Sequence, residues 1–126
     1  MSIKAIVTDK APAAVGPYSA ATQAGSCIHV SGQLPIDPAT GEFAGDDIKA
    51  QTRQSLTNIK NILEAAGASM ANVAEVTVLL DSIADFGPMN EVYGEFFSEP
   101  YPASAAFEVA ALPKAAKVEI KAVAYL

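Results

Sequence analysis

The chain has 126 residues, a net charge of −6 and an isoelectric point of about 4.6. This length predicts a single domain over residues 1–126, large enough to bury a hydrophobic core. Its seven lysines and one arginine are mostly dispersed, whereas nucleic-acid binding needs clustered positive charge, so we expect no nucleic-acid partner. The sequence has no secretory leader and no run of about 18 apolar residues, so we expect a soluble cytoplasmic protein without a membrane partner.

The composition also bears on assembly. Only 17% of the residues are charged while 51% are hydrophobic, a balance that favours burial of apolar surface between subunits in a small domain. Cys27 is the only cysteine, which excludes an intrachain disulfide, and no Cys/His cluster predicts a zinc site. We therefore expect an oligomer.

The first third of the chain predicts three strands. Residues 3–7 are rich in β-branched side chains, and residues 18–23 and 26–31 are joined through a hairpin connection at Gly25. Prolines and glycines punctuate residues 35–45, which predicts a loop.

The clearest predicted element is an amphipathic helix that follows this loop. Asp46 or Asp47 can cap its start, and Gly67 ends it. The apolar side chains between these ends recur at intervals of three and four residues, as a helix covering a sheet requires. They are Ile48, Leu56, Ile59, Ile62, Leu63 and Ala66.

The second half of the chain predicts one more helix and three strands. Residues 73–80 are apolar on both faces near their end, which indicates a strand with neighbours on both sides. Asp81 or Ser82 then caps a second amphipathic helix. Residues 104–110 and 117–125 alternate in hydrophobicity and predict the last two strands.

The resulting order, β-β-β-α-β-α-β-β, predicts an α+β fold with two helices packed on one face of a sheet. The other face is left to pack on a partner. Alternation along the last two strands predicts small or charged residues on this face, and we expect the two strands to be adjacent and to form a wet cleft or polar interface. These residues are Lys117, Glu119 and Lys121 on the last strand, and Ser104, Ala106 and Glu108 on the preceding one.

Several polar residues could carry chemistry, and each has a structural alternative. Glu119 could orient a water or accept a proton, although an alternating Lys-Glu-Lys strand is more often an ion-paired surface. His29 is the only histidine and is more simply structural or interfacial, and Cys27 is more simply a small buried side chain. Ser31 and Gly32 could offer a hydroxyl and a free N–H to a ligand, or could form an ordinary turn.

Four segments of the chain resemble the RidA (YjgF) family in order and spacing. They are residues 11–19 (APAAVGPYS), 30–35 (VSGQLP), 51–60 (QTRQSLTNIK) and 102–122 (PASAAFEVAALPKAAKVEIKA). The resemblance spans essentially the whole chain. It implies a chorismate-mutase-like fold assembled as a homotrimer, with a central barrel, outer helices and three clefts between subunits. Active members hydrolyse 2-imino or 2-enamino acids to 2-keto acids and ammonia without a metal or cofactor.

The same resemblance assigns roles to residues of this sequence. It predicts one catalytic residue, Glu119, which positions the attacking water. It predicts contacts with a small 2-imino or 2-keto acid from Tyr18, Ser31, Gly32, Asn90, Ser104 and Ala106.

The sequence departs from the family pattern at Ser104. Active members have arginine there, and its planar guanidinium holds the substrate carboxylate through two parallel hydrogen bonds, which a serine hydroxyl cannot reproduce. Arg53 belongs to another motif, and we do not expect it to reach the cleft. Lys121 could supply a point charge, but we expect it to pair with Glu119 or Glu108.

Two functional hypotheses remain after these observations. The first is a RidA-type deaminase scaffold whose activity is impaired or redirected because Ser104 replaces the arginine. The second is a non-catalytic trimer that holds a small metabolite or a partner protein in its clefts. Ribonuclease activity is disfavoured, since the chain lacks a basic track and has a single histidine.

Overall fold

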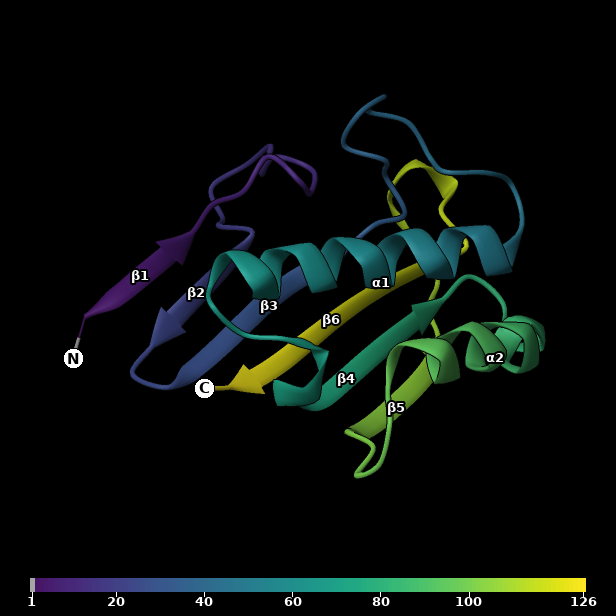
Figure 1. Ribbon diagram of the computed structural model, residues 1–126. Helices are drawn as coiled ribbons and strands as arrows, with labels where there is room; N and C mark the ends of the chain where they lie inside the picture. Colours follow the sequence, from purple (N-terminus) through teal and green to yellow (C-terminus); the bar gives the residue numbers. More distant parts are fainter. Residues whose placement is uncertain (1) are drawn as a thin grey trace.

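The computed structural model describes residues 2–126 and contains six strands and two α-helices in the predicted order. They are β1 (Ile3–Ile6), β2 (Ala21–Ala24), β3 (Cys27–Gln33), α1 (Ile48–Ala65), β4 (Val73–Leu80), α2 (Phe86–Phe96), β5 (Ala103–Glu108) and β6 (Val118–Tyr125). The strands form one sheet in the order β1-β2-β3-β6-β4-β5 (Figure 1). Among the described residues, β4–β5 is the one parallel pair, which makes the sheet mixed.

The start and end of α1 confirm the sequence prediction. The Asp47 carboxylate accepts a hydrogen bond from the Ala50 amide at 2.7 Å, as an N-cap residue does. Gly67 adopts a φ of +80°, and the amide after it donates to the carbonyl of Leu63 at 2.9 Å. This left-handed glycine closes the helix, since a residue with a Cβ rarely adopts that conformation.

Two predicted boundaries are wrong for local reasons. The second strand begins at Ala21 rather than at residue 18, because Tyr18 lies in a turn in which its amide donates to Gly16 at 2.8 Å. Ser82 caps a 3-10 turn (Ile83–Asp85) by accepting from Ala84, and α2 begins only after that turn.

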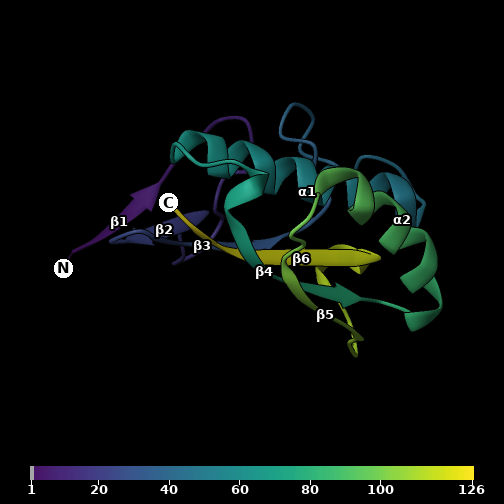
Figure 2. The ribbon, with the colours of Figure 1, turned by 60° about the horizontal axis from the view of Figure 1, so that its bottom comes forward.

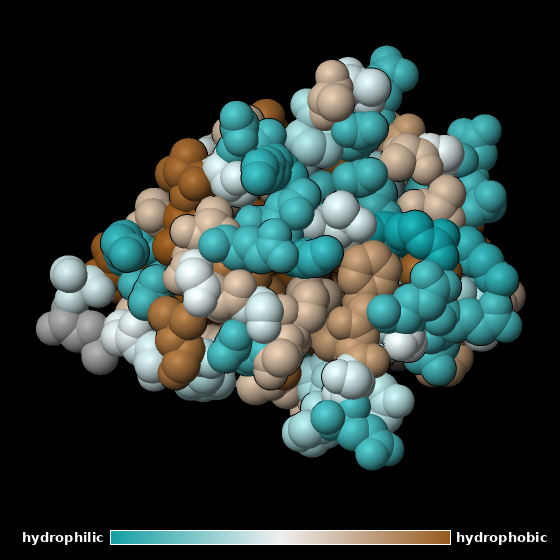
Figure 3. Space-filling model, in the orientation of Figure 1, coloured by the Kyte–Doolittle hydropathy of each residue, from teal (hydrophilic) through white to brown (hydrophobic). Residues whose placement is uncertain are grey.

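Both helices cover the same face of the sheet, as predicted (Figure 2). Four alternate residues of β6 (Val118, Ile120, Ala122 and Ala124) are at most 3% exposed beneath α1. Their neighbours Glu119 and Lys121 project from the open face. The outer surfaces of the helices are largely hydrophilic (Figure 3), so the apolar stripe of each helix packs against this core.

The prediction that the last two strands are adjacent is wrong, and so is the face assigned to β5. β4 lies between β5 and β6. The register pairs Ser104 with Val76 and Ala106 with Val78, so Ser104 and Ala106 face the helices. The hydrophobic alternation assigned the wrong face because β5 is an edge strand. All of its residues except Ala106 are exposed, so hydrophobicity does not distinguish its inner face from its outer one.

Among residues 2–126, no helix is long and apolar enough to cross a membrane.

Candidate functional site

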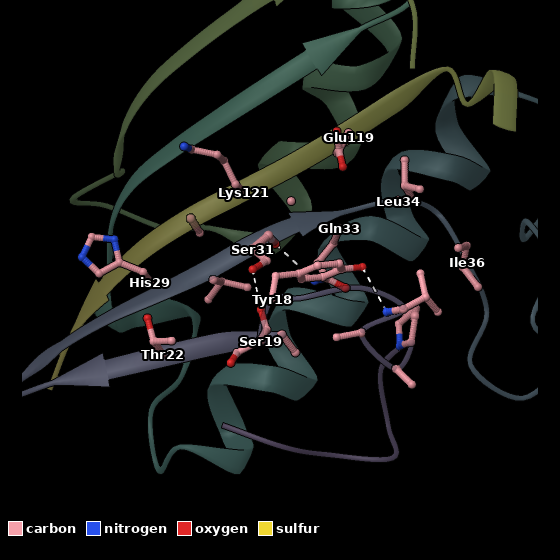
Figure 4. A pocket seen from close by; sticks show the side chains of 18 of the residues that line it. Tyr18, Ser19, Thr22, His29, Ser31, Gln33, Leu34, Ile36, Glu119 and Lys121 are labelled. Atoms are coloured by element: carbon pink, nitrogen blue, oxygen red, sulfur yellow. Dashed lines mark hydrogen bonds between the residues drawn. The ribbon is translucent and has the colours of Figure 1, made fainter. Parts of the chain in front are cut away.

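A cleft of about 970 Å³ lies on the open face of the sheet. Its floor is formed by β2, β3 and β6, and its rim by the loops around residues 12–20, 34–36 and 113–114 (Figure 4). Two polar side chains of α1 fix this rim from behind. Asn58 donates to the carbonyls of Leu34 and Ile36, and Gln51 accepts from the amide of Lys117 at 2.9 Å.

Tyr18 forms an aromatic wall of this cleft and is 53% exposed. Its hydroxyl accepts a hydrogen bond from the Val15 amide at 3.4 Å, which folds the preceding loop back over the ring (Figure 4). A Cβ on Gly16 would lie 3.3 Å from the Tyr18 ring, so glycine allows the loop to pass closely. The tyrosine therefore presents a large, amphipathic surface to a ligand.

Ser31 and Gly32 lie at a β-bulge, where the pairing of β3 with β6 shifts register between Val30 and Gln33. The Ser31 hydroxyl donates to the carbonyl of Ser19 at 2.6 Å and so ties the Tyr18 loop to the cleft floor (Figure 4). Bulges of this kind re-aim side chains beside binding sites.

Gly32 allows the carboxyl group of Glu119 to lie directly against the backbone of β3. A Cβ at Gly32 would be 2.8 Å from Oε2 and 3.0 Å from Cδ of Glu119. Any larger residue would therefore displace the carboxyl group from its present position.

Glu119 is half-buried, and burial raises the pKa of its carboxyl group above the ordinary value of 4.5. Residues 2–126 contain two ion pairs, and neither includes Glu119. A carboxyl group without a cationic partner and with a raised pKa is suited to exchange protons with a bound ligand or water.

The ion pairing predicted for Lys121 is not formed. Lys121 and Glu119 both project from the open face of β6, but the Lys121 side chain leans away from Glu119 (Figure 4). The two side chains form no ion pair within residues 2–126. Glu108 instead accepts from the amide of Ile83 at 2.9 Å.

Three of the predicted site residues lie outside this cleft. Ser104 and Ala106 face the helices on the edge strand β5, and Asn90 is an exposed residue of α2. Ser104 lies close to Tyr93, whose buried hydroxyl has no partner in hydrogen-bonding geometry among residues 2–126. Burial raises the pKa of Tyr93, and the Ser104 hydroxyl offsets part of that rise.

His29 lies at the other end of the cleft floor, and Cys27 lies beside it on β3, outside the cleft lining. His29 is exposed and lines the cleft, and its Nε2 is 3.3 Å from Sγ of Cys27. Cys27 is half-buried rather than buried, because it projects from the open face of the sheet. Residues 2–126 hold no group of three His, Cys, Asp or Glu side chains that could ligate a metal ion.

Lys114 also lines the cleft, at the rim before β6, and was not among the predicted site residues. Lys114 and Ala115 both have a φ of 57°, in the left-handed region. This conformation costs about 1–3 kcal/mol for each non-glycine residue and persists only where the surroundings impose it. No sequence pattern signals such a pair, because Lys and Ala are not typical of left-handed positions.

Comparison with known proteins identifies the family. A family model described as Endoribonuclease L-PSP matches residues 8–126. The chain belongs to this family, the RidA (YjgF) family.

Similar proteins agree with that membership along the whole chain. A RutC family protein of Pyrococcus horikoshii is 55% identical over 120 residues, covering 95% of each chain. The protein named 2-iminobutanoate/2-iminopropanoate deaminase of Bos taurus is 50% identical over 121 residues, covering 96% of this chain and 88% of its own. The crystal structure of RidA from the Antarctic bacterium Psychrobacter is 50% identical and superposes with a TM-score of 0.94, covering 98% of this chain and 99% of its own. The two-helix, six-strand architecture described above is thus that of RidA-family neighbours.

Proposed function

We propose that this RidA-family chain hydrolyses reactive 2-imino and 2-enamino acids to 2-keto acids and ammonia, with activity lowered or redirected by Ser104. The observation that carries the proposal is the unpaired, half-buried carboxyl group of Glu119, held against Gly32 and facing a cleft walled by Tyr18. Similar proteins named as deaminases of 2-iminobutanoate and 2-iminopropanoate support the same chemistry.

Hydrolysis of an imine requires water addition and two proton movements. Water attacks the carbon of the C=N bond, and one of its protons must leave while the nitrogen gains one. In the resulting carbinolamine, the hydroxyl proton moves to the nitrogen as the C–N bond breaks, so that a C=O bond forms and ammonia departs. Glu119 is suited to accept the proton of the attacking water and return it to the nitrogen. Its raised pKa lies closer to the working pH, at which the same carboxyl group must both accept and donate a proton.

We propose that the complete site is shared between subunits of a homotrimer. Asn90, Ser104 and Ala106 lie on α2 and β5, away from the cleft of their own chain, so a neighbouring copy would have to bring them to it. Exposed Phe107 and Tyr125 on the open face would be covered by the same assembly. The proposal predicts a mass of three times 13.0 kDa in light scattering, and a mass of 13.0 kDa would contradict it.

The expected cost of Ser104 follows from the loss of a charged partner. Loss of one side of a desolvated charge-assisted pair costs about 2–5 kcal/mol, which corresponds to roughly 30-fold to several thousand-fold in binding or rate. Ser104 is exposed in a single chain and offers one neutral hydroxyl group in place of the guanidinium. This substitution also favours the second candidate function, a trimer that binds a small 2-keto acid or a partner without catalysis.

The test is the release of ammonia from freshly generated 2-iminopropanoate and 2-iminobutanoate. We expect the unmodified chain to accelerate release over buffer, and Glu119→Gln to lose on the order of 10²-fold or more of that acceleration. Glu64→Gln, an exposed change on α1, is the matched control and should have no effect. Release at the rate of buffer, or full activity in Glu119→Gln, would contradict the proposal and favour the binding function.

A further inference from the structure

The cleft contains positively charged side chains that take no part in the reaction proposed above. Its lining includes two lysines, Lys114 and Lys121, and neither belongs to the ion pairs formed within residues 2–126. The only arginine is unavailable to the cleft, because Arg53 binds both carboxylate oxygens of Glu95 on α2, at 2.8 and 2.9 Å.

The two lysines differ in how they are held. Lys121 extends from the middle of β6 to the side away from Glu119 (Figure 4). Lys114 lies on the short loop that leads into β6, only five residues before Glu119, and at the rim of the same cleft.

The loop of Lys114 is anchored on both sides. Leu112 before it is 8% exposed, and Ala116 after it is fully buried. The amides of Ala115 and Ala116 donate to the carbonyls of Leu112 and Pro113, each at 3.2 Å. The side chain of Gln51 accepts from the next amide, that of Lys117. These anchors impose the left-handed conformation of Lys114 (φ 57°, ψ 24°) while its side chain stays exposed.

A strained lysine at this position is hard to explain by packing. Glycine would adopt the same backbone conformation without a steric cost, and the exposed side chain adds little to the core. A cation at the rim of a cleft that also holds a carboxyl group does, however, allow the cleft to bind the two ends of a ligand through two different groups.

We propose that Lys114 is the anion-binding residue of this cleft and receives the carboxylate of the ligand in place of the arginine absent at Ser104. This inference rests on the proposed function, since it names the group that holds the acid end of that substrate class. An ammonium group is a point charge rather than a planar fork, so it holds a carboxylate without fixing its orientation. The site should therefore bind 2-keto acids by charge, with a strong dependence on salt.

The test is equilibrium binding of 2-oxobutanoate to the unmodified chain and its variants by calorimetry, at low salt and at about 0.15 M salt. We expect Lys114→Gln to weaken binding on the order of tenfold, and Lys114→Arg to bind within about threefold of the parent. Lys10→Gln removes the same charge outside the cleft and should leave the affinity unchanged.

A second variant separates a role in binding from a role in folding. Lys114→Gly relieves the left-handed strain and should raise the melting temperature while weakening 2-oxobutanoate binding as much as Lys114→Gln does. Parental affinity in Lys114→Gln or Lys114→Gly, or the absence of saturable binding by the unmodified chain, would overturn the inference.

The binding readout is independent of catalysis. Binding that depends on Lys114 without any ammonia release would refute the proposed deamination and leave the anion site standing. Ammonia release with binding that is indifferent to Lys114 would refute the anion site and leave the proposed deamination standing.

Discussion

Replacement of Gly32 by alanine perturbs the position of Glu119 with very little change elsewhere. The added Cβ would lie 2.8 Å from Oε2, 3.0 Å from Cδ and 3.2 Å from Cγ of Glu119. Carbon atoms in favourable contact lie about 3.5–4.0 Å apart, so the carboxyl group must retreat by roughly 0.5–1 Å.

The two consequences of this displacement differ in size. The contacted atoms belong to the end of a flexible, half-buried side chain, so we expect Gly32→Ala to cost about 1 kcal/mol or less of folding free energy. A catalytic group that is misplaced by about 1 Å loses on the order of 10²-fold in rate. Gly32→Ala should therefore lower deamination far more than it lowers stability.

The assay compares ammonia release from 2-iminobutanoate and thermal unfolding, in the unmodified chain and in the Ser104→Arg chain. Gly94→Ala is the matched control, because a Cβ at that exposed position of α2 meets no atom within 4 Å. Full activity in Gly32→Ala would refute the importance of the Glu119 position. A loss of several kcal/mol in stability would refute the expectation that the Glu119 side chain moves to accommodate the new methyl group.

Three further predictions concern stability and pH. Asp47→Ala should destabilise the protein by about 1 kcal/mol in chemical denaturation, because it removes the N-cap of α1. Asn58→Ala should cost about 2–3 kcal/mol, since it leaves the carbonyls of Leu34 and Ile36 without their buried donor. Because the folded-state pKa of Glu119 is raised, the folded state binds more protons, and the contribution of Glu119 to stability should fall as pH rises from 4.5 through the folded pKa. Glu119→Gln should abolish that part of the slope of melting temperature against pH, and an unchanged slope would contradict it.

The fold was predictable wherever local chemistry and packing agree. The cap at Asp47, the glycine at 67 and the alternation along β6 each follow from short-range patterns that the core then reinforces. Tyr18 was misassigned to a strand because an aromatic residue favours strands, whereas here a turn at Gly16 holds it over the cleft.

The candidate site was predictable only in part. Family motifs pointed to Glu119, Gly32 and Tyr18, which the structure brings to one cleft. The placement of Ser104 on the opposite face depends on the parallel pairing of β5 with β4, which sets Ser104 opposite Val76, a long-range pairing that alternation cannot reveal. Lys114 was not among the predicted site residues because its backbone conformation is imposed by buried anchors on both sides of its loop and not by its own propensity.

The most direct test of this account is ammonia release from 2-iminobutanoate by the unmodified chain and by its Ser104→Arg variant. Ser104 is exposed on β5, so the variant should fold without burying a charge. If the chain is a RidA scaffold weakened at one position, the arginine should raise the rate roughly 30-fold or more over the unmodified chain. Release at the rate of buffer by both the unmodified chain and a folded Ser104→Arg protein would contradict the account and leave a binding protein, and an equal rate above buffer would refute the role given to Ser104.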